Sequence, residues 1–175
     1  RTRRAAVADH GLGRPLTAVR HGPAPAQFTA ADGDGTLHEF DARSGAWREV
    51  ARLGARVTRI ARSAQHVAAA LADGSLVVLK DERGTNGSGT NGGGTLTELH
   101  RLPGAMPAPI PCLDFSPDGA LLAMGSVGSS TAMLDVAKGE VLWRFDLPGG
   151  HGWIGRAAHR TGGPACIELA RDPYF

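Results

Sequence analysis

Lysine is almost absent from this chain of 175 residues, since all but two of its 19 basic residues are arginines. The formal net charge of +2 is too small to indicate a polyanionic partner. An arginine-rich, lysine-poor composition is typical of a chain encoded by a GC-rich genome. We therefore take the arginines as background composition and expect no nucleic-acid partner.

Cysteine and long apolar runs are scarce as well. Two cysteines, Cys112 and Cys166, cannot form a disulfide framework, and each lies in an apolar stretch where a buried thiol is typical. The sequence has no run of about 18 apolar residues, so we expect no transmembrane helix. Residues 1–10 lack the apolar core of a signal peptide. We expect no membrane partner and an intracellular location, cytoplasmic rather than nuclear.

Turn-forming residues are abundant where aromatic residues are not. The chain has 25 glycines and 11 prolines, against 5% aromatic residues. Hydrophobic residues make up 42% of the sequence, which suits one globular domain with a buried core. Short strands joined by glycine and proline turns predict an all-β fold.

An internal repeat organises the sequence. Three segments share a glycine-bearing turn, a short strand, an apolar–polar pair and a glycine four residues later. These segments are 30–45, 70–84 and 125–139. Their pairs are Phe40-Asp41, Leu79-Lys80 and Leu134-Asp135, and the closing glycines are Gly45, Gly84 and Gly139. The polar members of the pairs lie 39 and then 55 residues apart.

The longer interval contains a low-complexity insertion. Residues 85–95 read TNGSGTNGGGT, a polar glycine-rich sequence that cannot bury a core. We expect a flexible loop here, because the entropy cost of closing a loop grows only slowly with its length. Without this insertion the repeat returns to about 40 residues, the length of a four-stranded β-propeller blade.

The repeat predicts a partial β-propeller whose blades each hold four antiparallel strands. We expect about three and a half blades. The boundaries are 1–15 for a tail or the end of a preceding blade, 16–54, 55–110 and 111–150 for three blades, and 151–175 for the start of a fourth. Predicted inner strands read LTAVRHG, VTRIARS, PCLDFSPDG and WIGRAAHR, and predicted outer strands WREVARL, TLTELHRL and VLWRFDL.

One segment carries a family resemblance. Residues 112–126, CLDFSPDGALLAMGS, followed by AMLDVAKGEVLW, resemble a WD repeat, in which an FSPDG-like turn joins the first two strands. The resemblance covers most of the chain and implies a protein-binding propeller. No repeat has the Trp-Asp pair, and a Gly-His pair occurs only at Gly150-His151, so most of the family's His–Asp network is missing. The segment 135–143 also resembles a blade of the quinoprotein propellers, which is the alternative.

An open arc of blades would expose two sheet faces, which soluble proteins avoid. We therefore expect further sequence on both sides or completion by another chain. Residues 3–10 are a candidate outer strand of a neighbouring blade.

The stretch 50–71 also fits a different structure. Its apolar residues recur in alternating steps of three and four, which is a helical heptad pattern, with arginines on the other face. A basic amphipathic helix could bind a partner or a membrane surface. Gly54 argues against it, because glycine inside a helix costs about 1 kcal/mol relative to alanine.

No catalytic, cofactor or metal site emerges from the motifs. Asp32 and Asp34 lie in a glycine-rich turn that could offer oxygen ligands to calcium, but a third ligand and a distal Glu are lacking, and a tight turn explains them. The sequence 87–92 matches G-x-G-x-x-G, yet three more glycine and threonine residues follow where a helix would have to begin. The seven histidines form no spaced pair.

The favoured function is a protein–protein interaction scaffold without catalysis, within a multi-subunit complex. Partner contacts are expected on turns at one face of the blades. The candidate partner-binding residues are His21, Arg56, Pro109, His151, Trp153 and Arg156. The alternatives are a quinoprotein-like propeller enzyme and the basic helical binding segment.

Overall fold

The computed structural model describes residues 11–22, 24–82, 95–107, 109–127 and 130–146, together with the backbone of residues 153–158 and 166–171. These residues form strands and turns, and they contain no α-helix. Within them no helix has the length and apolarity needed to cross a bilayer. The predicted outer strand at 3–10 and all but the last residue of the insertion at 85–95 lie outside the described residues.

The strands follow one another with short turns between most of them. Their bounds are β1 (Leu16–His21), β2 (Gln27–Asp32), β3 (Thr36–Asp41), β4 (Ala46–Arg52), β5 (Val57–Arg62), β6 (His66–Leu71), β7 (Leu76–Asp81), β8 (Leu96–Leu102), β9 (Cys112–Phe115), β10 (Leu121–Gly125), β11 (Ser130–Asp135), β12 (Glu140–Asp146), β13 (Trp153–Ala158) and β14 (Cys166–Arg171). The predicted inner and outer strands that fall on described residues are all present.

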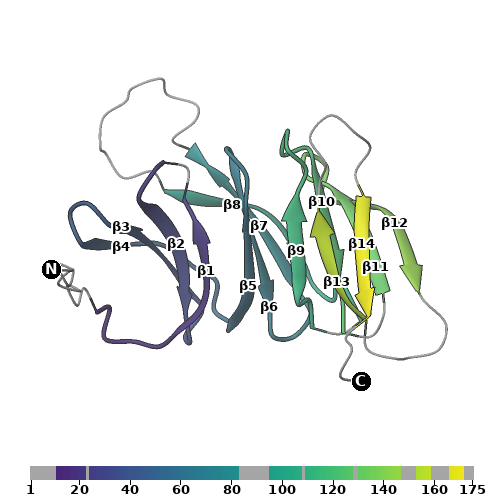
Figure 1. Cartoon of the computed structure of the whole chain (residues 1–175), viewed down its shortest axis with the longest axis horizontal. Helices are drawn as coiled ribbons and strands as arrows, with labels where there is room; N and C mark the ends of the chain where they lie inside the picture. Colours follow the sequence, from purple (N-terminus) through teal and green to yellow (C-terminus); the bar gives the residue numbers. More distant parts are fainter. Residues whose placement is uncertain are drawn as a thin grey trace, which may run out of the picture.

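Each group of four consecutive strands forms one antiparallel sheet. We call β1–β4 blade 1, β5–β8 blade 2 and β9–β12 blade 3, while β13 and β14 form a two-stranded hairpin. The sheets stand in a row, and the first strand of each lies against the first strand of the next (Figure 1). This is the predicted all-β fold of a partial propeller with four-stranded antiparallel blades.

The repeat identified in the sequence has a structural counterpart. Asp41 and Asp135 are the polar members of two of the pairs, and they end the third strands of blades 1 and 3. Their carbonyl oxygens accept hydrogen bonds from the amides of Gly45 and Gly139. Both glycines have φ near +70°, a conformation that glycine adopts at little cost. In blades 1 and 3 the closing glycine is therefore the residue that turns the chain into the outer strand, whereas Gly84 lies outside the described residues.

The contact between blades 1 and 2 is an aliphatic core. Leu37 and Val50 of blade 1 meet Val67, Val77 and other apolar residues of blade 2, all nearly or fully buried. Each fully buried leucine or valine side chain stabilises the fold by roughly 2 kcal/mol relative to exposure. Because these side chains pack together, Leu37 of β3 and Val67 of β6 both face the boundary between blades 1 and 2.

A second core joins blades 2 and 3. It contains Leu76 and Val78 of β7, Leu122 of β10 and Leu134 of β11. Because Leu76 and Val78 alternate with Val77 and Leu79, which face blade 1, strand β7 is covered on both faces. Blade 2 is thus a central layer, and its inner sequences are apolar at nearly every position.

The helical prediction for residues 50–71 is wrong. This stretch forms the end of β4, all of β5 and all of β6. Gly54 has φ +74°, which breaks any helix at the connection between two blades. The step of three and four arises because Val57, Ile60 and Val67 face blade 1 from two strands separated by a turn.

A β-bulge changes the face of the aromatic residues in β12. Val141 is opposite Leu134, whereas Trp143 is opposite Met133, with the register shifting between them. Because Met133 and Leu134 are consecutive in β11, they point to opposite faces of the sheet. Val141 and Trp143 therefore lie on opposite faces, although simple alternation places them on one.

Candidate functional site

One end of the blades is built from the connections between them. The connection 53–56 leads from blade 1 to blade 2, and 103–111 leads from blade 2 to blade 3. Backbone hydrogen bonds fasten both connections to neighbouring turns: Leu53 donates to Gly35, Ala72 to Arg56, and Val127 to Pro109. We call this end of blades 1–3 the connection end.

The connection end brings together two of the predicted partner-binding residues. Arg56 and Pro109 are both exposed there. Val127, which sequence reasoning did not select, is 54% exposed beside Pro109. The structure thus places a basic side chain and apolar side chains on the same end of the molecule.

The structure separates His21 from these two residues. His21 ends β1 and lies at the opposite end of blade 1, where its ring is 4.9 Å from that of Phe28. His151 lies outside the described residues. Trp153 begins β13 and Arg156 lies within it, and the structure describes the backbone alone at both positions.

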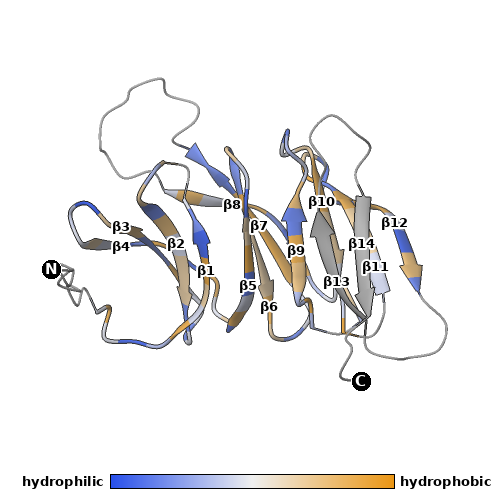
Figure 2. Ribbon diagram, viewed as in Figure 1, coloured by the Kyte–Doolittle hydropathy of each residue, from blue (hydrophilic) through white to orange (hydrophobic). Residues whose placement is uncertain are grey.

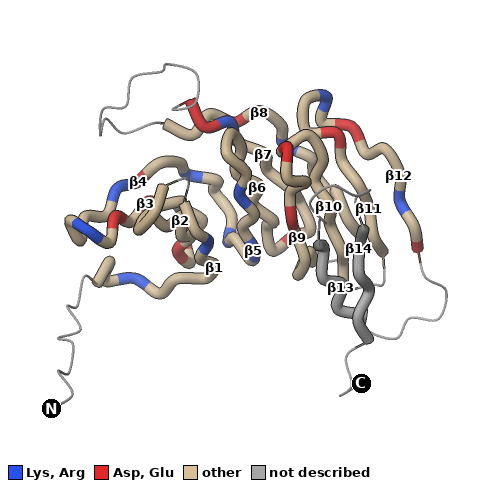
Figure 3. Tube along the Cα trace, turned by 45° about the horizontal axis from the view of Figure 1, so that its top comes forward, with Lys and Arg blue, Asp and Glu red and all other residues tan. Residues whose placement is uncertain are grey.

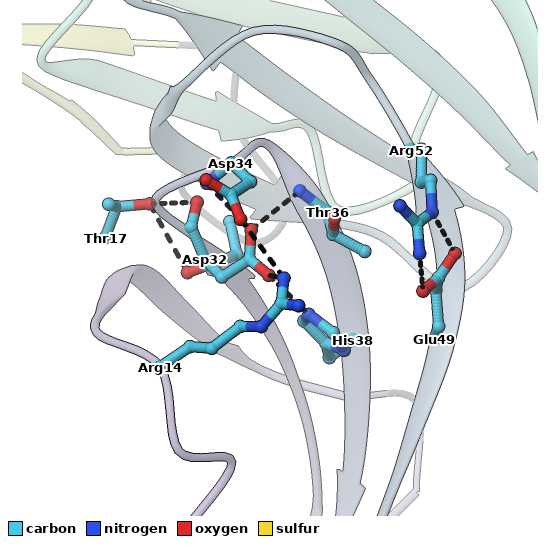
Figure 4. A network of polar contacts seen from close by, with 9 residues as sticks. Arg14, Thr17, Asp32, Asp34, Thr36, His38, Glu49 and Arg52 are labelled. Atoms are coloured by element: carbon cyan, nitrogen blue, oxygen red, sulfur yellow. Dashed lines mark hydrogen bonds and ion pairs between the residues drawn. The ribbon is translucent and has the colours of Figure 1, made fainter.

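A polar network centred on Asp32 holds the connection end of blade 1 (Figure 4). One carboxylate oxygen of Asp32 accepts hydrogen bonds from the amides of Asp34 and Thr36, at 3.0 and 2.9 Å. The other oxygen lies 2.9 Å from Nε2 of His38 and 3.5 Å from the guanidinium of Arg14. The Asp32 side chain is 1% exposed, so these donors replace its water shell.

The electrostatics of Asp32 follow from these contacts. Burial alone raises the pKa of a carboxyl group, because it disfavours the charged form. The hydrogen bonds from His38, Thr36 and Asp34 outweigh that effect and lower the pKa of Asp32 to about 2. The carboxylate is therefore a saturated acceptor that ties β2, β3 and the segment before β1 together.

The glycine-rich turn at 31–35 is part of this network, because Asp32 accepts hydrogen bonds from the amides of Asp34 and Thr36 around it. The turn closes between β2 and β3, with the amide of Gly35 donating to the carbonyl of Asp32. Gly35 has φ +82°, and a Cβ there would lie 2.1 Å from the carbonyl oxygen of Ala55. Among the described residues, no group of three or more His, Cys, Asp or Glu side chains is placed to hold a metal ion.

A second polar network crosses the boundary between blades 1 and 2. Arg62 of β5, with a side chain 5% exposed, forms an ion pair with Asp81 of β7. It also lies 3.7 Å from Glu39 of β3 and donates to the hydroxyl of Thr29 at 3.0 Å. Glu39 is bonded in turn to Arg48 at 2.7 Å. These buried charges link the two blades beside their apolar core.

Two arginines join the inner strands of successive blades. Arg20 of β1 donates to the carbonyl of Ile60 at 2.9 Å, and Arg59 of β5 donates to that of Pro111 at 2.5 Å. Since the inner strands also pack side by side, the three blades are connected by apolar contacts, buried charges and hydrogen bonds. These contacts hold the three blades to one another and position the turns at their ends.

Comparison with known proteins shows which solved structures share this architecture. No family model matches the sequence, and no curated protein matches it. Solved structures do match its fold. The RRP9 WD40 repeats and U3-55K each superpose with a TM-score of 0.68 over 91% of this chain, at 15% and 14% identity. The chain has the fold of part of a WD40 β-propeller.

A third match and the lengths of the matched chains complete the comparison. The β-propeller domain of Cps50 (Swd1) from Myceliophteria thermophila matches 80% of this chain with a TM-score of 0.63 and 12% identity. The chain spans 46% of the length of each of the three structures. At these identities the likeness establishes the WD40 fold, and it supports the resemblance seen in residues 112–143.

The structure also contains polar contacts that the sequence did not predict. Blade 1 contains a His–Asp hydrogen bond, but it joins His38 and Asp32 across one hairpin rather than using a Gly-His pair before the inner strand. The available signal was a spacing of six residues around a tight turn with Thr36 between them. Arg62 and Asp81 gave no such signal, because they pair from two non-adjacent strands of blade 2, β5 and β7, 19 residues apart in the sequence.

Proposed function

We propose that this chain is part of a protein–protein interaction scaffold, working within a multi-subunit complex, and that its connection end contacts partner proteins. The single observation that carries the proposal is the shared exposure of Arg56, Pro109 and Val127 on one end of interlocked blades. Arginine and apolar side chains on a rigid surface are well suited to become the buried centre of an interface.

The rigidity of this surface supports the proposal. Each connection is hydrogen-bonded to a turn of a neighbouring hairpin, so little conformational freedom is lost when a partner binds. The charged groups around it are mixed, with Arg14 and Asp34 paired at 3.1 Å and both exposed (Figure 3). Trp153 and Arg156 of β13 belong to the same proposal, whereas His21 does not.

The test compares matched arginine substitutions at the two ends of the blades. Arg56 is exposed on the connection end, and Arg43 is exposed in the β3–β4 turn at the opposite end. Partners are cross-linked to the tagged chain in cell extract and quantified by mass spectrometry. We expect Arg56→Glu and Val127→Asp to lower the yield of specific partners at least about tenfold, which corresponds to 1.4 kcal/mol of binding free energy. Arg43→Glu leaves it unchanged.

Two outcomes oppose the proposal in different ways. Equal losses for Arg56→Glu and Arg43→Glu, or no loss for either, would place the contact elsewhere on the molecule. The absence of any specifically cross-linked protein with the unmodified chain would reject the scaffold function itself. Trp153→Ala and Arg156→Ala extend the same assay to β13.

A further inference from the structure

Strand β12 exposes an unusual amount of apolar surface. The exposed fractions are 38% for Val141, 50% for Leu142, 43% for Trp143 and 53% for Phe145. The outer strands of the other two blades differ: β8 exposes one large apolar residue, Leu99 at 37%, and β4 exposes none. Figure 2 shows the apolar colour on β12 at the rim of the molecule.

The outer edge of β12 is also unpaired among the described strands. β12 ends its sheet and pairs with β11, and among the described strands the backbone groups of its outer edge have no other partner. Proteins guard such edges with charged side chains. β4 and β8 carry them in the ion pairs Glu49–Arg52 and Glu98–Arg101, but the described residues contain no such pair within β12.

A further sheet stacked on blade 3 would not pair this edge. Blades stack through their faces, as the cores between blades 1, 2 and 3 show, and the outer strands stay at the rim. Since Val141 and Trp143 point to opposite faces, a sheet placed against one face would cover only one of them. Neither arrangement would pair the free edge.

The charges on β12 indicate what kind of strand would fit the edge. Glu140 and Asp146 at its two ends are exposed, and neither forms an ion pair with another described residue. The basic residue between them, Arg144, donates its hydrogen bond to the carbonyl of Ala105 in the preceding connection. The available edge is therefore apolar in its centre and acidic at both ends.

A second copy of the chain fits this pattern poorly. Antiparallel pairing of two β12 strands centred on Trp143 would place Glu140 opposite Asp146 at each end. Like charges directly opposite each other destabilise a strand pair. A strand with basic residues at its ends would instead place opposite charges at both positions.

We propose that β12 binds an extended segment of a partner protein by strand addition, with alternating apolar residues between two basic ends. Backbone hydrogen bonds to the free edge would supply affinity, and the apolar residues and end charges would supply specificity. The proposal rests on the proposed scaffold function, which it deepens by naming the chemistry of one partner. It uses none of the residues on the connection end.

The experiment uses the full chain and two fluorescein-labelled peptides, KVTVTVK and EVTVTVE, in fluorescence anisotropy titrations. We expect the lysine-ended peptide to bind more tightly. Leu142→Lys and Trp143→Lys should each weaken its binding at least tenfold. Leu99→Lys is the matched control, because Leu99 lies at the corresponding bulge of β8, and it should leave binding unchanged.

Charge reversal gives an independent readout. The double variant Glu140→Lys/Asp146→Lys should bind the glutamate-ended peptide more tightly than the lysine-ended one. Far-UV circular dichroism and denaturant unfolding confirm that each variant is folded. If Leu142→Lys does not fold, Leu142→Gln with Glu140→Lys/Asp146→Lys still tests the same edge.

Several results would overturn this proposal. They are no binding of the lysine-ended peptide at millimolar concentration, an equal loss with Leu99→Lys, an unchanged preference after charge reversal, and a dimer in sedimentation equilibrium that Leu142→Lys dissociates. In the last case a second copy occupies the edge. Arg56→Glu should not affect peptide binding, so failure at β12 is separate from failure at the connection end.

Discussion

The imidazole of His100 occupies the space in which a side chain on Gly139 would stand. A Cβ on Gly139 would lie 2.6 Å from Nδ1 of His100. The other ring nitrogen, Nε2, is 3.1 Å from the carbonyl oxygen of Val136, and it is the protonated one because a carbonyl can only accept. The outer strand of blade 2 thereby caps the β11–β12 turn of blade 3.

We predict that Gly139→Ala destabilises the fold more than Gly54→Ala. Gly139 has φ +70° and Gly54 has φ +74°, and this left-handed conformation costs alanine about 1–2 kcal/mol. Only Gly139 has a neighbour within 4 Å, and overpacking adds about 1–3 kcal/mol. Denaturant unfolding measures both free energies. His100→Ala in the Gly139→Ala background should recover part of the loss, and equal losses for the two glycine variants would contradict the contact.

The Asp32 network predicts a pH-dependent contribution to stability. Its pKa in the fold is about 2, below the ordinary 3.8, so the contribution is complete above pH 4 and is lost as the pH falls toward 2. A shift of this size corresponds to about 2 kcal/mol. Asp32→Asn should therefore lower the free energy of unfolding at pH 7 by about that amount, with the difference from the unmodified chain shrinking below pH 4.

The control for this prediction is Asp34→Asn. The Asp34 side chain is 77% exposed, so its ion pair with Arg14 should contribute little. Urea unfolding at a series of pH values compares the two variants. A constant difference between Asp32→Asn and the unmodified chain from pH 7 to pH 2 would show that the carboxylate charge is not what stabilises the turn.

The buried charges between blades 1 and 2 should be far more sensitive to substitution than surface pairs. Arg62→Leu would leave the buried carboxylates of Asp81 and Glu39 without that cation, and breaking a buried pair costs about 3–5 kcal/mol. Arg62→Leu/Asp81→Leu should recover part of the loss, because both charges are then removed. A double-mutant cycle from denaturant unfolding measures the coupling, and a loss below about 1 kcal/mol for Arg62→Leu would refute it.

The thiol of Cys112 should react slowly in the folded chain. Burial raises its pKa above the ordinary value, although the nearby charge of Arg59 acts in the opposite direction. Less thiolate is present at pH 8 than in a free thiol, so iodoacetamide should alkylate Cys112 more slowly than it alkylates glutathione. Peptide mass spectrometry follows the reaction, and urea should restore a normal rate. A rate in the folded chain equal to that of glutathione would exclude this protection.

The strands of the propeller could be predicted because the repeat lies in the local sequence. The apolar–polar pairs at the ends of β3 and β11 and the closing glycines Gly45 and Gly139 mark one turn in each blade. The helical alternative at 50–71 arose because blade 2 is covered on both faces. Where Ala68, Ala69 and Ala70 are all buried, period-two alternation disappears from the sequence.

The polar contacts could not be predicted in the same way. Arg62 pairs with Asp81 within blade 2 and with Glu39 across the boundary to blade 1, and no local spacing encodes either contact. The bulge in β12 shifts Trp143 to the face opposite Val141, which no alternation rule anticipates. The partner-binding prediction had a similar limit. His21 ends the inner strand of blade 1 and Arg56 precedes the inner strand of blade 2, so the two residues lie at opposite ends of the blades.

Arginines of the outer strands β8 and β12 donate hydrogen bonds to residues that come much earlier in the chain. Arg101 donates to the carbonyl of Leu53, 48 residues before it, and Arg144 donates to that of Ala105, 39 residues before it. During synthesis on the ribosome, each inter-blade connection therefore waits for the outer strand of the following blade before its last hydrogen bond can form. Nascent blades would mature one after another from the N-terminus, each completed by its successor.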